Sequence, residues 1–339
     1  MFLKAAKASL ILVYLVIVAG ALVRMTGSGM GCPDWPKCFG YYIPPTDIKE
    51  LLWTPNHQYL ENQVIIKDEK LLVATSDFIS KEKFNNANFR QYTKHDYAIF
   101  NAVETWIEYI NRLVGALAGL AVFAMAVLSF KYFKSNKKIT LFSWLTVFLM
   151  GFQGWLGARV VYSVLNPVKI TIHMIVALVI VAMLLYVIKN VSKSTENFVF
   201  NSNFNKIIII TFCLTFIQII LGTQVRQYVD DQVKILGYEQ MSKVLSNPEI
   251  TFYIHRSFSL LILTLNGFLL FKNRNLALGF TKINWVAGFI GLEIVTGMAM
   301  YYLDFPYTSQ PIHLVIASLL FGVQFYLVLE SKSKTTNEL

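Results

Sequence analysis

Apolar residues fill eight stretches of the 339-residue chain, each long enough to cross the hydrocarbon core of a bilayer, which is ~30 Å thick. A span in lipid must satisfy its backbone amides and carbonyls internally, so each stretch is predicted to be a helix. The pattern predicts an all-α polytopic membrane protein with eight transmembrane helices. The predicted spans are residues 6–23, 106–130, 139–158, 168–189, 206–225, 251–271, 282–303 and 310–330.

Basic residues gather in the short connections on one side of the predicted helices and at both ends of the chain. They are Lys4, Lys7, Lys131, Lys134, Lys137, Lys138, Lys189, Lys193, Lys206, Lys272, Arg274, Lys282, Lys332 and Lys334. Short cytoplasmic loops are enriched in Lys and Arg, so we expect a protein of the plasma (inner) membrane with both termini in the cytoplasm. The formal net charge of +10 is then mostly a topology signal, and no nucleic-acid binding is expected.

The first apolar stretch follows two lysines, as the core of a signal peptide would. However, it is long for such a core, and no clear small-x-small cleavage site follows it. We therefore interpret it as a retained helix. The connection of residues 24–105 then lies outside the cell, and its own charges are too far from the helices to influence orientation.

The second half of the chain repeats the marked residues of the first half in the same order. The matches are GALVR 20–24 with GTQVR 222–226, YINR 109–112 with YIHR 253–256, GFQ 151–153 with GLE 291–293, and IHMIVA 172–177 with IHLVIA 312–317. Both copies begin and end on the same predicted side, so the repeat is parallel. It predicts two four-helix bundles, residues 1–190 and 191–339.

The two copies differ most in the connection after their first helix. In the first copy this connection, residues 24–105, is polar and rich in Asn and Lys. We expect it to be an inserted segment with little core of its own.

Three of the five histidines fall near the predicted outer ends of helices, and two of these, His255 and His313, lie in the second bundle. Polar residues at membrane depth usually face the interior of the bundle and mark function. Two imidazoles on facing helices would approach one flat cofactor from opposite sides, and haem is the natural candidate. Zinc would usually require a third or fourth protein ligand. Arg256 could pair with a haem propionate or could lie at the membrane interface.

The first bundle keeps one histidine at these positions, His173. Opposite it are Asn111 and, one helical turn earlier, Glu108, which can address the same cavity. A carboxylate beside a bound cofactor could move protons, whereas near a helix N-terminus it could simply stabilise the helix. The pattern suggests a stable bis-histidine site in one bundle and an incompletely ligated site in the other.

Two of the three cysteines, Cys32 and Cys38, lie in the CPDWPKC motif of the outer connection. An oxidising compartment allows a disulfide between them, and two free thiols are the alternative. A structural zinc site needs about four ligands, and only His57 and His95 lie in the same connection, without a motif spacing. The third cysteine, Cys213, is expected to pack within a helix.

Several motifs together resemble the haem A synthase family. They are GALVRMTGSGMGCPDWPKCFGYYIPP, IEYINR, IHMIVAL, YIHR and PIHLVIA, and the likeness covers nearly the whole chain except much of residues 47–95. The resemblance implies oxidation of the C8 methyl of haem O to a formyl group by successive hydroxylations, with oxygen from water. It implies haem O as substrate, haem A as product and haem b as cofactor.

The resemblance also assigns roles to residues. His255 and His313 would be the axial ligands of haem b, His173 would ligate the substrate haem, and Glu108 would be the essential acid. Cys32 and Cys38 match the paired cysteines of the family. Apart from the resemblance, Asn111, Arg112 and Arg256 are further candidates to line the haem sites, which the predicted topology puts toward the outer face. Haem O synthase and cytochrome oxidase assembly are the implied partners, together with membrane lipid, an unidentified electron acceptor and a possible second copy of the chain.

Asn111 departs from the family pattern, which generally has a histidine there. Haem O could be five-coordinate through His173, His57 or His95 could fold over the site, or the chain could be a divergent member without the chemistry. The first is the prediction we adopt. The main alternative function is a bis-histidine b-type cytochrome that transfers electrons without acting on a substrate, and a second is a small-molecule transporter, since parallel repeats also occur in transporters.

Overall fold

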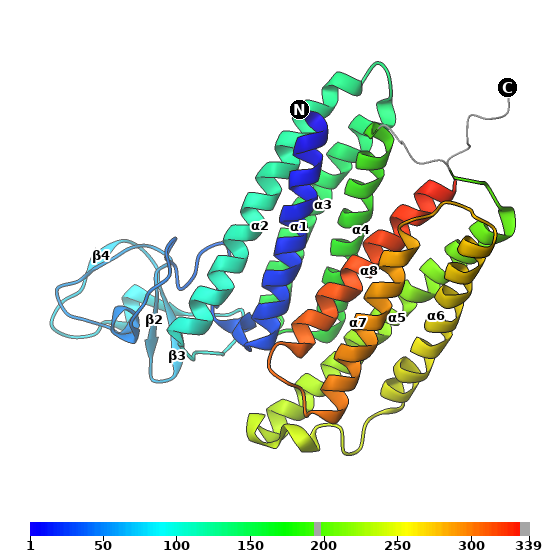
Figure 1. Cartoon of the computed structure of the whole chain (residues 1–339). Helices are drawn as coiled ribbons and strands as arrows, with labels where there is room; N and C mark the ends of the chain where they lie inside the picture. The colour runs from blue at the N-terminus through cyan, green and yellow to red at the C-terminus, as the bar shows by residue number, and fades with distance from the viewer. Residues whose placement is uncertain (193–197, 333–339) are drawn as a thin grey trace. The chain divides into compact units, whose positions relative to one another are not determined.

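The computed structural model describes residues 1–192 and 198–332, in which eight long helices are apolar enough to cross a membrane (Figure 1). They confirm the predicted fold class and agree with most predicted spans to within a few residues. The helices are α1 Phe2–Met25, α2 Ala102–Leu128, α3 Lys137–Tyr162, α4 Pro167–Val191, α5 Ser202–Leu236, α6 Ile250–Asn275, α7 Ile283–Tyr302 and α8 Ser309–Ser331. The topology lysines Lys193 and Lys334 lie outside the described residues, and the predicted orientation stays a prediction.

Helix α5 continues well past its predicted end at residue 225, to Leu236. The apolar run stops at residue 225, and beyond it ion pairs along the helix surface stabilise the helix. Arg226 pairs with Asp230 at 2.8 Å in an i,i+4 arrangement, and Asp231 pairs with Lys234 at 3.8 Å. Such pairs stabilise a helical turn without hydrophobic burial, so hydropathy alone underestimated the length of α5.

The chain forms two compact units, each described separately. The first comprises residues 1–18, 118–150 and 174–339. In it, α5 contacts α6 and α8, and α7 contacts α6 and α8, which makes a four-helix bundle. Its core is apolar and includes Phe204, Ile262 and Leu320. A second core in this unit contains side chains of α1, α2 and α4, such as Val13, Met125 and Leu184. The predicted division of the chain into two bundles at residue 190 stays a prediction.

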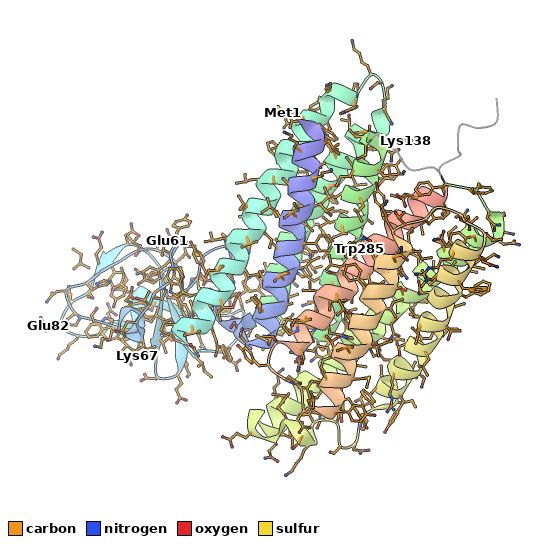
Figure 2. The ribbon with its side chains drawn as sticks, in the orientation of Figure 1. Met1, Glu61, Lys67, Glu82, Lys138 and Trp285 are labelled. Atoms are coloured by element: carbon orange, nitrogen blue, oxygen red, sulfur yellow. A yellow bond between two sulfur atoms is a disulfide. The ribbon has the colours of Figure 1, made fainter. Side chains whose placement is uncertain are left out.

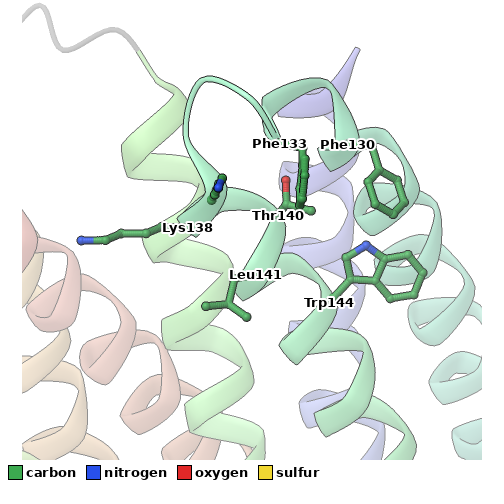
Figure 3. Close-up of a pocket in the computed structure, with 7 residues that line it drawn as sticks. Phe130, Phe133, Lys138, Thr140, Leu141 and Trp144 are labelled. Carbon is green, nitrogen blue, oxygen red and sulfur yellow. The ribbon is translucent and has the colours of Figure 1, made fainter.

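An open apolar pocket lies in the first unit, where α2 ends and α3 begins (Figure 3). Its lining residues are Phe130, Phe133, Lys137, Lys138, Thr140, Leu141 and Trp144. None of these side chains is a histidine or a carboxylate, so the pocket offers no iron ligand. The histidines remain the candidate iron ligands.

The second unit comprises residues 19–117 and 151–173 and carries the β-strands. Three antiparallel strands in the order β2–β3–β5 form one sheet, and two form another; Figure 2 shows Glu61, Lys67 and Glu82 on this segment. The strands are β1 Gln58–Tyr59, β2 Val64–Lys67, β3 Lys70–Ala74, β4 Phe78–Ile79 and β5 Phe89–Gln91. The turn between β2 and β3 has positive φ at Asp68 and Glu69, as a two-residue hairpin favours.

The expectation that the long connection has little core of its own is wrong. Tyr59, Ile65 and Phe89 are buried together beneath the strands. A second cluster packs Leu51 and Val64 against the two cysteines of CPDWPKC. The apolar runs of β2 and β3 are short and are separated by polar turns, so the sequence alone did not indicate that they form a core.

Candidate functional site

His255 and His313 occupy helices α6 and α8 of the four-helix bundle. Each imidazole packs against a glycine of the preceding helix. A Cβ on Gly222 would lie 3.1 Å from His255 Cε1, and one on Gly297 would lie 3.8 Å from His313 Cε1. A side chain at Gly222 would push the His255 ring aside, so glycine makes room for this imidazole.

Polar side chains hold the two histidines in different ways. Gln218 of α5 donates from Nε2 to the backbone oxygen of His255 at 2.9 Å. His313 is held through its ring, because Nδ1 lies 2.8 Å from Thr296 Oγ1 and 3.1 Å from Glu293 Oε2. Contacts at Nδ1 leave Nε2 of His313 as the nitrogen able to bind a metal.

This pair of histidines fits haem. The described residues contain no group of three or more His, Cys, Asp or Glu side chains able to hold a metal ion, whereas a conventional zinc site uses three or four protein ligands. Haem iron needs only two axial ligands from the protein. In addition, His255 Nδ1 is buried with no partner in the described part of the chain, so this imidazole is a buried polar group that is not fully satisfied within those residues.

In the second unit, His173 is held much as His255 is. Gln153 of α3 donates from Nε2 to the backbone oxygen of His173 at 2.9 Å. A Cβ on Gly157 would lie 3.5 Å from His173 Cε1. Within the described residues His173 Nδ1 is buried and has no partner. His173 therefore has the same glycine and glutamine contacts as His255, but it is the one histidine at these repeat positions in the first half.

Asn111 takes the place that His255 has in the repeat. A Cβ on Gly20 of α1 would lie 4.0 Å from Asn111 Oδ1, just as Gly222 faces His255. Asn111 Oδ1 is buried and lacks a partner among residues 1–192 and 198–332. The packing of the helix pair is retained, but the imidazole is replaced by a short amide.

Glu108 lies one turn before Asn111 and is almost completely buried, with 4 % of its surface exposed. Its Oε2 accepts from the backbone N–H of Cys32 at 2.9 Å, and its Oε1 lies 2.6 Å from Arg112 Nη2. Helix α2 begins at Ala102 and has Glu104 as its first-turn acid, so stabilisation of a helix N-terminus does not explain Glu108.

Arg112 links Glu108 to the CPDWPKC loop. It donates from Nη1 to the carbonyls of Asp34 and Lys37 at 2.8 and 2.9 Å, and from Nη2 to that of Cys32 at 3.3 Å. Cys32 and Cys38 form a disulfide with an S–S distance of 2.02 Å, which confirms the first of the two alternatives for these residues. One guanidinium thus fixes the loop and the acid together.

Two features missed in the sequence place this loop. A Cβ on Gly31 would lie 2.6 Å from the carbonyl carbon and oxygen of Glu104, so only glycine allows the loop to approach the first turn of α2. Asp34 accepts from the amides of Phe39 and Gly40 at 2.5 and 2.8 Å. Burial raises the pKa of Asp34 above its usual range, although these amides and Arg112 act to lower it. An aspartate shortly before a glycine turn was the available signal.

A family model described as cytochrome oxidase assembly protein (COX15-CtaA) matches residues 5–63 and 66–325. The chain belongs to this family.

Relatives of this cytochrome oxidase assembly family member include the Heme A synthase of Flavobacterium johnsoniae, 24 % identical over 352 residues that cover 93 % of each chain. The Heme A synthase of Wolbachia pipientis from Culex pipiens is 26 % identical over 342 residues, again 93 % of each chain. That of Shewanella oneidensis is 28 % identical over 179 residues, which cover 53 % of this chain and 42 % of the relative. The relationship inferred from the sequence motifs is confirmed.

Three further predicted residues lie in other surroundings. His57 is exposed and packs edge-on against Tyr59, whereas His95 bonds through Nε2 to the carbonyl of Pro33 at 3.0 Å. Neither contact involves Asn111. Arg256 is exposed and lies with Cζ 5.4 Å from the ring centre of Tyr301. The predicted ligand roles of His57 or His95 and the propionate role of Arg256 stay predictions.

Proposed function

We propose that this family member is a haem A synthase, an oxidoreductase that converts the C8 methyl of haem O to a formyl group with oxygen taken from water. The observation that carries the proposal is a buried acid, Glu108, in the same compact unit as His173, in a chain whose relatives along nearly their full length are heme A synthases.

The second half of the chain supplies the cofactor site in this proposal. His255 and His313 would hold haem b, which supplies one-electron transfer when it is bound. Gly222 and Gln218 keep the His255 ring and its backbone in place, while Glu293 and Thr296 fix the ring of His313. The small and fixed surroundings restrict both imidazoles to one orientation.

The first half of the chain supplies the substrate site. His173 would be the protein ligand of the iron of haem O, and its backbone is held by Gln153. Asn111 carries no imidazole, so we propose that haem O is five-coordinate here. A single axial bond suits a group that must enter as substrate and leave as product, because fewer bonds must break on release.

Glu108 is the residue to which we assign proton transfer. The methyl carbon loses hydrogen and gains a water-derived oxygen in two successive hydroxylations, and the resulting geminal diol loses water to give the formyl group. Protons released in these steps would pass to the Glu108 carboxylate, and electrons would pass to an external acceptor. Arg112 and the Cys32 N–H each occupy one Glu108 oxygen, which fixes the carboxylate but leaves a lone pair on each oxygen for a proton.

Further proposals follow from this activity. Haem O synthase would supply the substrate, and assembling cytochrome oxidase would use the product. Both haem sites would face the outer side of the plasma membrane, because the basic loops of the predicted topology lie on the other side.

The proposal is tested by producing the protein in cells that make haem O and extracting the haems from the purified protein and the membranes. Haem A in the extract, absent from cells with an empty vector, is the expected result. Haem B alone in the presence of haem O would contradict the proposal and favour the electron-transfer alternative. A protein that carries no haem at all would favour the transporter alternative.

A further inference from the structure

The helix that faces each histidine carries a short motif whose chemistry differs at one of the three sites. In α3 and α5 the residue four positions before the imidazole-facing glycine is glutamine, and the residue just before the glycine is leucine. In α7 these residues are Glu293 and Thr296 instead. The corresponding pairs are Gln153 with Leu156, and Gln218 with Leu221.

The exchange of glutamine for glutamate changes which part of the histidine is held. Gln153 and Gln218 donate N–H to the backbone oxygens of His173 and His255, both at 2.9 Å. Glu293 has no amide N–H to donate to a backbone oxygen, and its carboxyl group approaches the imidazole instead, with Oε2 3.1 Å from His313 Nδ1. Its second oxygen, Oε1, is buried without a partner in the described part of the chain, so the imidazole is the contact that holds this side chain.

Thr296 contacts the same ring nitrogen. Its hydroxyl reaches the backbone oxygens of Leu292 at 2.8 Å and Glu293 at 3.1 Å, and Oγ1 lies 2.8 Å from His313 Nδ1. In the tautomer with the proton on Nδ1, that proton faces both Thr296 Oγ1 and Glu293 Oε2. The Nδ1 atoms of His173 and His255, by contrast, are buried and unpartnered in the described residues.

We infer that Glu293 and Thr296 form a built-in device that sets the reduction potential of the iron bound by His313, by drawing the Nδ1 proton toward a carboxylate. This inference rests on the proposed haem b site. A carboxylate that accepts the N–H of an axial histidine makes the imidazole a stronger electron donor, which stabilises ferric over ferrous iron and lowers the potential. Glu293 is a positioning residue, since it acts through His313. The device favours delivery of electrons outward from this haem.

The chain itself provides the variant that removes the device. The double substitution Glu293→Gln with Thr296→Leu copies into α7 the pair that faces His255 in α5, so it introduces a setting in which a histidine of this protein already packs. We expect the full-length variant to bind haem b with a low-spin bis-histidine spectrum and a more positive midpoint potential. At a fixed ambient potential the ferrous-to-ferric ratio should rise by about tenfold, equivalent to ~59 mV for a one-electron couple.

The matched control is Glu249→Gln, which removes an exposed carboxylate just before α6. It should leave the midpoint potential unchanged, and a shift equal to that of the double variant would overturn the inference. If the double variant does not bind haem, Thr296→Val alone keeps the carboxylate as the sole partner of Nδ1. Its potential should stay at or below that of the wild type, and a rise equal to about a tenfold change in the ratio would contradict the role of the carboxylate.

The redox titration tests the haem b site and the role of Glu293 and Thr296 separately. A wild-type protein without a bis-histidine haem would refute the proposed cofactor site. A wild-type protein with that haem, and a double variant with the same potential and the same electron paramagnetic resonance g values, would refute only the role of Glu293 and Thr296.

Discussion

The two halves of the chain share helix contacts and differ in the chemistry that these contacts hold. In each half, glycines of two helices face polar side chains of the helices that follow. The pairs are Gly20 with Asn111, Gly157 with His173, Gly222 with His255 and Gly297 with His313. Three of the four polar residues are histidines, and the contact at Asn111 persists without one. The packing of the helix pair therefore does not require a histidine at this contact.

Residues next to these contacts also differ between the two halves. Glu108 of the first half corresponds to Phe252 of the second, which stacks on Tyr301 with ring centres 5.7 Å apart. Where the first half has Gly154, whose Cβ would lie 4.0 Å from the Trp35 ring, the second half has Ile294. At these two positions the first half thus has an acid and space for a loop side chain, whereas the second half has apolar side chains. The difference agrees with the proposal that only the first half acts on a substrate.

The largest effect is expected from removing a ligand in the second half. His255→Ala or His313→Ala should abolish the b-type absorption spectrum of the purified protein, because one axial bond and its imidazole are lost. His57→Ala, on the exposed part of the strand segment, is the control and should keep the spectrum. A normal spectrum in both variants would mean that haem b is bound elsewhere, and it would refute the proposed haem b site in the second half.

The acid of the first half should matter next. Glu108→Gln keeps the size of the side chain and one acceptor oxygen but cannot take a proton, so haem A formation should fall by about 10²–10⁴-fold while bound haem is retained. The haem content of cell extracts measures both quantities. Glu104→Gln, one turn earlier in α2 and bonded to Asn101 at 2.8 Å, should form haem A normally. Wild-type turnover by Glu108→Gln would refute the role given to this residue.

The two corresponding arginines should differ in their contribution to stability. Arg112→Ala breaks a largely buried ion pair and three bonds to loop carbonyls, and should lower the free energy of unfolding by about 3–5 kcal/mol. Arg256→Ala loses a contact with Tyr301 worth about 0.5–1 kcal/mol. Thermal unfolding of the two variants in the same detergent compares them directly. Equal losses of stability would show that Arg112 does not hold the first half more tightly than Arg256 holds the second.

Opening the disulfide should cost less stability than removing Arg112. The bond joins two cysteines six positions apart and so closes a short loop, and replacing both by serine should cost about 2–3 kcal/mol of stability. Cys213→Ser changes the free cysteine of the described residues and should leave the unfolding temperature unchanged. A double serine variant as stable as the wild type would mean that Arg112 holds the loop without help from the disulfide.

The sequence predicted the helices well, and long-range contacts poorly, for physical reasons. Apolar runs of membrane length are required by the bilayer, so the spans and the repeat could be recognised directly. The fold of residues 47–95 could not, because its core forms between short strands whose pairing depends on turns rather than on one long periodic pattern.

The residues around the site show the same limit. His173, His255 and His313 stood out because polar residues are rare at membrane depth. The hydrogen bonds from Arg112 to the carbonyls of Asp34 and Lys37 join residues that are 78 and 75 positions apart, and no local sequence pattern indicates them. Glu293 was visible as the counterpart of Gln153, but only its distance to His313 Nδ1 shows what the exchange of an amide for a carboxylate does.

The spin and coordination states of the irons in the purified protein, loaded with haem O and measured by resonance Raman spectroscopy, test the difference between the halves most directly. We predict one six-coordinate low-spin haem bound by His255 and His313 and one five-coordinate high-spin haem bound by His173. The second signal should become low-spin in Asn111→His. Two six-coordinate low-spin haems in the wild-type protein would contradict the account, because Asn111 would then not mark an open iron position.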